Sequence, residues 1–145
     1  MTEPTPGQDS APDAEHEPAH DPEVLQLAAQ VFDLARLGDT AKLAAYIDAG
    51  VPANLTNDRG DTLLMLAAYH GHADTVRALL QRGAEVDRAN DRGQTPLAGA
   101  VFKGEREVVG ALVEGGADPA AGAPSAVDTA RLFGKDDLLT LLGAG

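Results

Sequence analysis

Two pairs of histidines are the first residues in this sequence that could do chemistry together. His70 and His72 flank Gly71, and His16 and His20 lie four positions apart. A zinc site needs three or four converging ligands, and the chain has no cysteine to complete either pair. No carboxylate is placed to converge with them in an evident motif. We therefore expect no metal site.

Catalytic nucleophiles and phosphate-binding loops are equally scarce. The two serines, Ser10 and Ser125, have no histidine at a suggestive spacing. No glycine-rich loop of the P-loop or dinucleotide-binding type occurs. The acidic pair Asp136 and Asp137 stands at the expected start of a helix, where negative charge favours the helix dipole. The sequence thus predicts no catalytic residue and no cofactor.

The charge balance disfavours further classes of partner. The chain has 23 acidic and 11 basic residues, for a net charge of −12. Nucleic acids and anionic membranes are bound by clustered Lys and Arg, so we expect neither as a partner. No apolar run approaches the roughly 20 residues of a membrane span, and the N-terminus lacks the pattern of a secretory signal. We expect a soluble, cytoplasmic protein, and the abundance of Ala, Gly and Arg is typical of a GC-rich bacterial genome.

Residues 1–22 differ in composition from the rest. They hold five of the nine prolines and six acidic residues, but no Lys or Arg. Without large apolar side chains to bury, nothing offsets the entropy of ordering, so this acidic segment is expected to be disordered. A first helix should follow, with Asp21 as N-cap, Pro22 in its first turn and Gly38 at its end.

A period of 33 residues organises the chain beyond that helix. The segment NDRGDT at 57–62 returns as NDRGQT at 90–95. Two series of glycines keep the same step, namely Gly38, Gly71 and Gly104, and Gly50, Gly83 and Gly116. Because many independent positions agree on one period, the sequence predicts a repeat protein.

Each period predicts two short helices and a turn. Thr62 and Thr95 are expected to cap the first helix of their units, and Pro96 suits the first helical position. Gly60 and Gly93 can adopt the positive φ that the intervening turn requires. A unit of this size cannot bury its own apolar face, so neighbouring units must stack into a continuous core.

Residues 57–122 resemble two ankyrin repeats. The similarity rests on the runs GDTLLMLAAYHGH at 60–72 and GAEVD at 83–87. It implies an all-α solenoid of stacked helix-turn-helix units with short β-turn or hairpin connections. The domain would span residues 23–145, with an N-terminal capping repeat at about 23–56, full repeats at 57–89 and 90–122, and a C-terminal capping repeat at 123–145. His72 stands where the family has a structural histidine.

Some residues depart from the family pattern. Met65 and Ala98 replace the histidine that normally bonds to the capping threonine. Gly99 and Gly110 fall inside expected helices, where glycine costs about 0.5–1 kcal/mol relative to alanine. We therefore expect the C-terminal half to be the less stable half.

The resemblance also implies where a partner would bind, because such arrays use the concave side formed by turn tips and first-helix ends. Aromatic side chains favour interface hot spots, and Tyr69 and Phe102 occupy equivalent positions in adjacent units, so we expect them to lie side by side. The alternative is that they merely cover the base of the neighbouring turn, and the repeated turns could be conserved for their shape alone. The candidate residues are Arg36, Tyr69, His70, Phe102, Lys103 and Phe133 at the helix ends, with Leu37 and Leu132 in the same rows, and Asp58, Arg59, Asp61, Asp91, Arg92 and Gln94 at the turns.

Three functions fit these features. The first is a protein-interaction module, monomeric when unbound, that acts as adaptor, scaffold or inhibitor and favours a partner with a basic patch. The second is a regulatory or immunity-type subunit whose acidic residues 1–22 block a basic site on an enzyme. The third is a structural module without a single partner.

Overall fold

The computed structural model describes residues 22–143 of the 145-residue chain. The chain divides into a unit of residues 1–31 and a unit of residues 32–145, and helix α1 (Pro22–Leu37) runs across the boundary. In the first unit, residues 22–31 are helical and mostly exposed. Pro22 begins the helix and Gly38 follows its end, as the sequence predicts; the expected N-cap Asp21 and the rest of the acidic segment lie outside the described residues.

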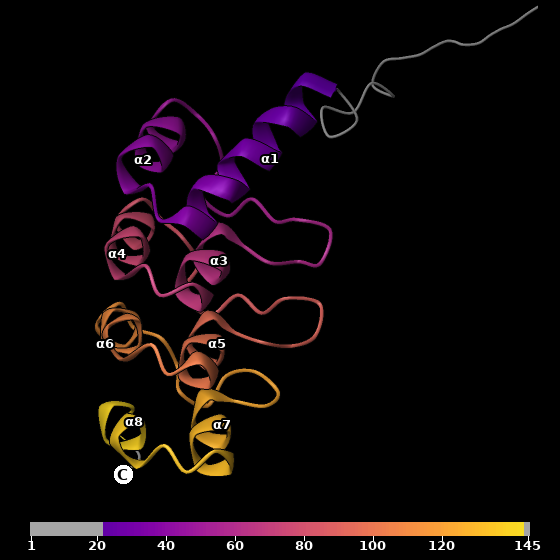
Figure 1. Ribbon diagram of the computed structural model, residues 1–145. Coiled ribbons are helices and arrows are strands. Elements are labelled where there is room, and N and C mark those ends of the chain that lie inside the picture. The colour runs from indigo at the N-terminus through magenta and orange to yellow at the C-terminus, as the bar shows by residue number, and fades with distance from the viewer. Residues whose placement is uncertain (1–21, 144–145) are drawn as a thin grey trace, which may run out of the picture. The chain divides into compact units, whose positions relative to one another are not determined.

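The second unit is built from pairs of short helices (Figure 1). No strand occurs within residues 22–143, so the expectation of an all-α solenoid is confirmed. Isolated bridges between Thr56 and Thr62 and between Gly122 and Ser125 are the only hairpin-like pairings there. The helices after α1 are α2 (Thr40–Asp48), α3 (Leu63–Tyr69), α4 (Ala73–Gln81), α5 (Pro96–Lys103), α6 (Arg106–Glu114), α7 (Ala126–Leu132) and α8 (Asp136–Leu141).

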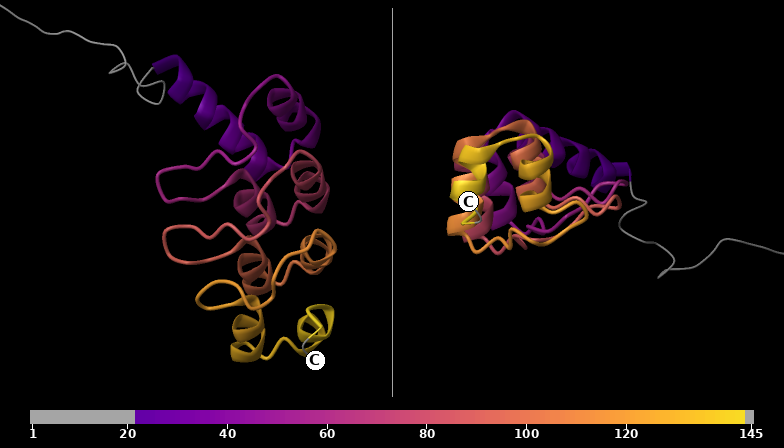
Figure 2. Two further views of the ribbon diagram at one scale, coloured as in Figure 1. Left: turned by 180° about the vertical axis from the view of Figure 1, so that it is seen from behind. Right: turned by 90° about the horizontal axis from the view of Figure 1, so that it is seen from below.

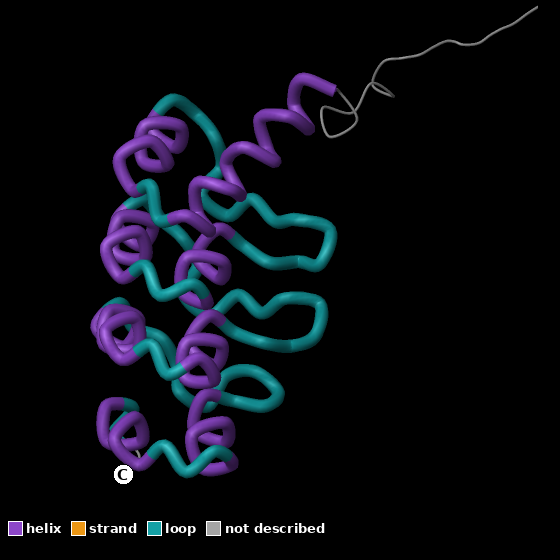
Figure 3. Tube along the Cα trace, viewed as in Figure 1, coloured by secondary structure: helices purple, strands orange, loops and turns teal. Residues whose placement is uncertain are grey.

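Within residues 32–145 the helices form two rows. Helices α3, α5 and α7 pack in one row, while α2, α4, α6 and α8 pack in the other. The connecting loops project from the first row to one side (Figure 3) and stack in register when seen along the array (Figure 2). This arrangement places the ends of the first-row helices beside the turns, as the 33-residue period predicts.

The core lies between the two rows and is made of leucine, valine and alanine. Leu63 and Leu64 of α3 and Leu97 of α5 are fully buried, as are Ala67 and Ala68. Small side chains let neighbouring first-row helices approach closely, which explains why so few aromatic residues are needed. The burial of these side chains stabilises the stack because no repeat has a core of its own.

Hydroxyl groups cap the three first-row helices. The Thr62 Oγ1 accepts a hydrogen bond from the Met65 N–H at 3.0 Å, and the Thr95 Oγ1 accepts one from the Ala98 N–H at 3.1 Å. Ser125 plays the same role at α7, where its buried Oγ accepts from the Asp128 N–H at 3.1 Å. Caps of this kind contribute about 1 kcal/mol each.

Asparagine organises both repeated turns. The Asn90 Oδ1 accepts hydrogen bonds from the N–H groups of Arg92 and Gln94, both at 3.0 Å, while its backbone N–H donates to the Gln94 carbonyl. Asn57 makes the equivalent bonds 33 residues earlier. Gly93, with φ +77°, closes the turn in the left-handed region that glycine tolerates. The repetition of the turn sequence therefore has a structural cause.

His72 joins two successive units. Its Nε2 lies 2.7 Å from the carbonyl oxygen of Arg36, which can only accept, so the ring donates this bond. A Cβ at Gly38 would lie 2.5 Å from the His72 ring, so glycine is required for the close approach. His72 therefore has the structural environment that the family resemblance implies.

Replacing Gly110 by alanine should raise the free energy of unfolding by about 0.5–1 kcal/mol, because alanine has the higher helix propensity. Gly110 lies inside α6, and a Cβ there would meet no atom within 4 Å. Urea unfolding measures the gain, and amide exchange in α6 should slow. Gly99→Ala is the comparison: its Cβ would lie 2.8 Å from the Met65 Cε, so the same gain is not expected. Unchanged or lower stability of Gly110→Ala would remove one basis for expecting a weaker C-terminal half.

Candidate functional site

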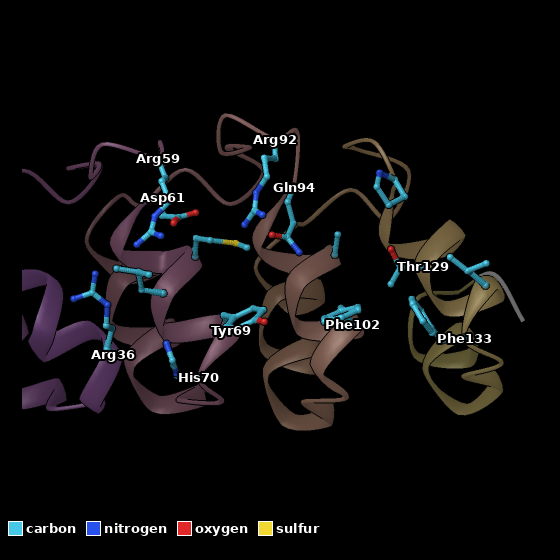
Figure 4. A pocket seen from close by; sticks show the side chains of 15 residues that line it. Arg36, Arg59, Asp61, Tyr69, His70, Arg92, Gln94, Phe102, Thr129 and Phe133 are labelled. Carbon is cyan, nitrogen blue, oxygen red and sulfur yellow. The ribbon is translucent and has the colours of Figure 1, made fainter.

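A groove of about 640 Å³ runs along the first-row helices on the side of the turns. Its 15 lining residues come from the end of α1, from α3, α5 and α7, and from the turns that precede them (Figure 4). All of them lie in the second unit.

The groove brings together nine of the twelve candidate residues. The other three do not line it: Asp58 and Asp91 are exposed at the turn tips, and Lys103 lies beside it. The nine are Arg36, Arg59, Asp61, Tyr69, His70, Arg92, Gln94, Phe102 and Phe133. Leu132, from the same row as Phe102, also lines the groove.

The deeper wall of the groove consists of residues that the sequence analysis did not select. Met65, Leu66, Ala98 and Thr129 are buried and form this wall, and the exposed Pro124 also belongs to the lining. Met65 and Ala98 carried a usable signal, because they stand where the ankyrin pattern has histidine. A thioether and a methyl group at these positions make the groove more apolar than histidine would.

The two aromatic rings of the central row have different neighbours. The Phe102 ring packs edge-on against Phe133, with centroids 5.5 Å apart. The Tyr69 ring meets His70 edge-on at 5.7 Å, and the Lys103 Nζ lies 5.1 Å from its centroid in cation–π geometry. Tyr69 and Phe102 thus line one groove, but the aromatic contact of Phe102 is with the next unit. Such ring pairs contribute about 0.5–1.5 kcal/mol.

Apolar exposure is concentrated at the α5–α7 end of the groove. Phe102 is 47% exposed, Phe133 52% and Leu132 74%. Leu37, in the same row as Phe133, is 75% exposed but does not line the groove. A contiguous exposed apolar patch in a hollow is typical of a binding surface.

Cationic side chains line the groove from α1 to the turn before α5. Arg59 and Arg92 extend from the turns over the groove, and Arg36 reaches it from α1 (Figure 4). Asp61 is the single acidic residue of the lining, and its Oδ1 accepts a bond from the Asn90 Nδ2 at 2.9 Å. The groove is therefore locally positive although the chain is strongly acidic.

The surroundings of His70 also reflect this positive field. Partial loss of hydration lowers the pKa of His70, and electrostatic interactions with the nearby His72, Arg36 and Lys103 lower it further. Glu105 offsets part of this effect. The lowered pKa favours the neutral imidazole at the groove surface.

Within residues 22–143, no three His, Asp or Glu side chains come together as metal ligands would, and His16 and His20 lie outside this range. No helix in that part of the chain is long and apolar enough to cross a membrane.

Comparison with known proteins identifies the repeat. The family model for ankyrin repeats, in three copies, matches residues 25–122, which is more than half of the chain. The match includes the unit at 23–56 that the sequence analysis treats as a degenerate cap. A protein of Pseudomonas aeruginosa named for its ankyrin repeats is 53% identical over 60 residues, which are 41% of this chain. The matched region covers 35% of that relative, so the chain spans about a third of its length.

Proposed function

Since this chain belongs to the ankyrin-repeat family, whose members are in general protein–protein interaction modules, we propose that it binds a partner protein through the groove described above. In this proposal it acts in the cytoplasm as an adaptor, scaffold or inhibitor and is monomeric when unbound. It performs no catalysis of its own. The family is typically a class of non-enzymatic binding modules, which supports this last point.

The observation that carries the proposal is the gathering of exposed apolar side chains in a shaped hollow. Phe102, Phe133 and Leu132 together expose roughly half or more of their surface within one groove. Water contact with so much apolar surface is unfavourable, and a partner that covers it gains about 25 cal/mol per Å² buried. Arginine and tyrosine, which favour hot spots, complete the same lining.

Co-purification tests the proposal. The tagged full chain is used to capture proteins from lysate, which mass spectrometry identifies, and the Tyr69→Ala/Phe102→Ala double variant is processed in parallel. A protein that the wild type retains and the double variant loses supports the groove as the binding surface. Recovery of no specific protein by the wild type would contradict the proposal.

A regulatory role for the acidic residues 1–22 is the second candidate. Six acids and no base in this stretch give it a charge of −6, half of the net −12. In this variant of the function, the segment blocks a basic site on the partner, which accords with a partner that carries a basic patch.

Replacing the six acids of residues 1–22 by their amides tests this role in the full chain. If the segment takes part, affinity for the captured partner falls and its salt dependence weakens, because paired charges are lost. Isothermal titration at two salt concentrations measures both. An unchanged affinity would remove the segment from the mechanism while leaving groove binding intact.

A further inference from the structure

We infer that the groove binds a partner segment that is acidic in one half and apolar in the other. This inference rests on the proposed function and specifies the chemistry of the bound partner. Its basis is the distribution of side chains along one continuous lining: the guanidinium groups come from α1 and from the turns before α3 and α5, and the exposed phenylalanine and leucine come from α5 and α7. Figure 4 shows Arg36 and Arg59 at one end and Phe133 at the other, with Arg92 and Phe102 between them.

The arginines of the turns are available for a ligand. Five of the eight arginines form ion pairs within the described residues, namely Arg36 with Asp33, Arg77 with Asp74, Arg82 with Asp48, Arg88 with Glu85, and Arg106 with Asp137. Arg59 and Arg92 form none with residues 22–143, although acids outnumber bases in the chain. Both project over the groove. Two unpaired guanidinium groups facing one hollow favour carboxylates, which they bind in bidentate geometry.

The one acid in the lining does not neutralise them. The Asp61 carboxylate accepts the Asn90 Nδ2 bond at 2.9 Å and lies in no ion pair within residues 22–143. Arg36 is paired with Asp33, an exposed pair that a ligand carboxylate could rearrange at little cost. The positive end of the groove therefore remains open to an acidic ligand.

The spacing of the repeats sets the spacing of the ligand charges. Arg59 and Arg92 occupy equivalent positions in successive turns, and the helices behind them pack side by side. Packed helices lie about 8–10 Å apart. An extended peptide advances about 3.3 Å per residue, so carboxylates about three residues apart would meet both guanidinium groups. From α3 to α7 is two such spacings, so an extended segment of about six residues reaches from the first of these turns to α7.

The apolar half of the segment would be held by a preformed aromatic pair. Phe102 and Phe133 pack against each other at 5.5 Å, so little side-chain freedom remains to be lost on binding. Leu132 extends the patch beside them. Leucine or phenylalanine side chains of the partner fit this surface, and lysine or arginine would be repelled from the other end.

The surrounding charge restricts the ligand to a short acidic segment. Residues 23–145 carry 17 acidic and 11 basic residues, a net charge of −6, so this part of the chain is acidic outside the groove. A long polyanion such as a nucleic acid would extend past the groove into this negative field, whereas a short peptide would not. Charge thus favours a protein segment over a nucleic acid.

A random peptide library displayed on phage, with inserts of about ten residues to exceed the groove length, tests the inference on the immobilised full chain. Three proteins are screened: the wild type, Arg59→Gln/Arg92→Gln, and the control Arg77→Gln/Arg106→Gln. The control removes the same charge from α4 and α6, away from the groove. The best wild-type peptide is then measured by fluorescence anisotropy against all three, with a single-stranded oligonucleotide as competitor.

The wild type and the control should enrich peptides with Asp or Glu in one half and Leu or Phe in the other. The Arg59→Gln/Arg92→Gln protein should still enrich peptides with Leu or Phe in one half, but without a preference for Asp or Glu in the other. It should bind the best wild-type peptide about tenfold more weakly than the wild type does. The inference would be overturned if the wild type enriched no peptides or only peptides without acidic residues. It would also be overturned if the Arg59→Gln/Arg92→Gln protein bound the wild-type peptide as tightly as the wild type does, or if the oligonucleotide displaced that peptide. The proposed function is judged separately, by whether the captured partner depends on Tyr69 and Phe102.

Discussion

Alanine at both Tyr69 and Phe102 is expected to weaken partner binding by more than about 2 kcal/mol, about thirtyfold in the dissociation constant. Both side chains line the middle of the groove, where truncation removes apolar contact area that water cannot replace. The change also removes the ring against which Phe133 packs and the ring beneath Lys103. Isothermal titration with the captured partner measures the loss.

Tyr46→Ala is the matched control for this prediction. Tyr46 is a half-buried aromatic residue of α2 that does not line the groove. Its truncation should leave affinity within about threefold of the wild type. Circular dichroism and thermal unfolding verify that the double variant remains folded, which is expected because Phe102 is about half exposed at 47%. Equal losses from both changes would show that the groove is not the binding surface.

Asn90→Ala should lower the free energy of unfolding by about 2–3 kcal/mol. The Asn90 side chain is 8% exposed and makes three bonds at once: it accepts from the N–H groups of Arg92 and Gln94, and donates to Asp61. Alanine would leave these partly buried groups without partners and would remove the Asn90–Asp61 bond between two successive turns, where the backbone bond from the Asp91 N–H to the Arg59 carbonyl would remain. Urea unfolding followed by circular dichroism measures the change.

Asp58→Ala provides the comparison within the neighbouring turn. Asp58 is exposed, and no hydrogen bond or ion pair of its side chain occurs within residues 22–143, so its replacement should cost less than about 0.5 kcal/mol. Asn57→Ala should fall between the two, because Asn57 accepts two turn bonds but has no counterpart of the Asn90–Asp61 contact. Similar costs at Asn90 and Asp58 would contradict the role assigned to the asparagine.

Much of the fold could be predicted because its signals are local and repeated. Thr62 and Thr95 predict helix starts because a threonine hydroxyl is a good N-cap, and both hydroxyls accept a hydrogen bond from a backbone N–H of the first turn. Gly60 and Gly93 predict turns that need a positive φ, and their φ angles are +76° and +77°. A fixed period then aligns these features, so the row containing Tyr69 and Phe102 follows by counting.

The remaining features depend on contacts between units, which counting does not reveal. Gly99 looks like a simple loss of helix stability, yet it accommodates the Met65 side chain of the preceding unit. Ser125 looks like an isolated hydroxyl, yet it caps α7. The net charge of the chain predicts a partner with a basic patch. In the groove, however, Arg59 and Arg92 form no ion pair within residues 22–143, so they contribute positive charge there that the net charge does not reveal.

Site-specific photo-crosslinking tests the central claim most directly. A benzophenone amino acid replaces Phe102 in one protein and Tyr46 in another, and each is irradiated with the captured partner. If the groove is the binding surface, the probe at 102 joins covalently to the partner in high yield, and the probe at 46 does not. Crosslinking at 46 with none at 102 would place the partner on the α2 side and contradict the account.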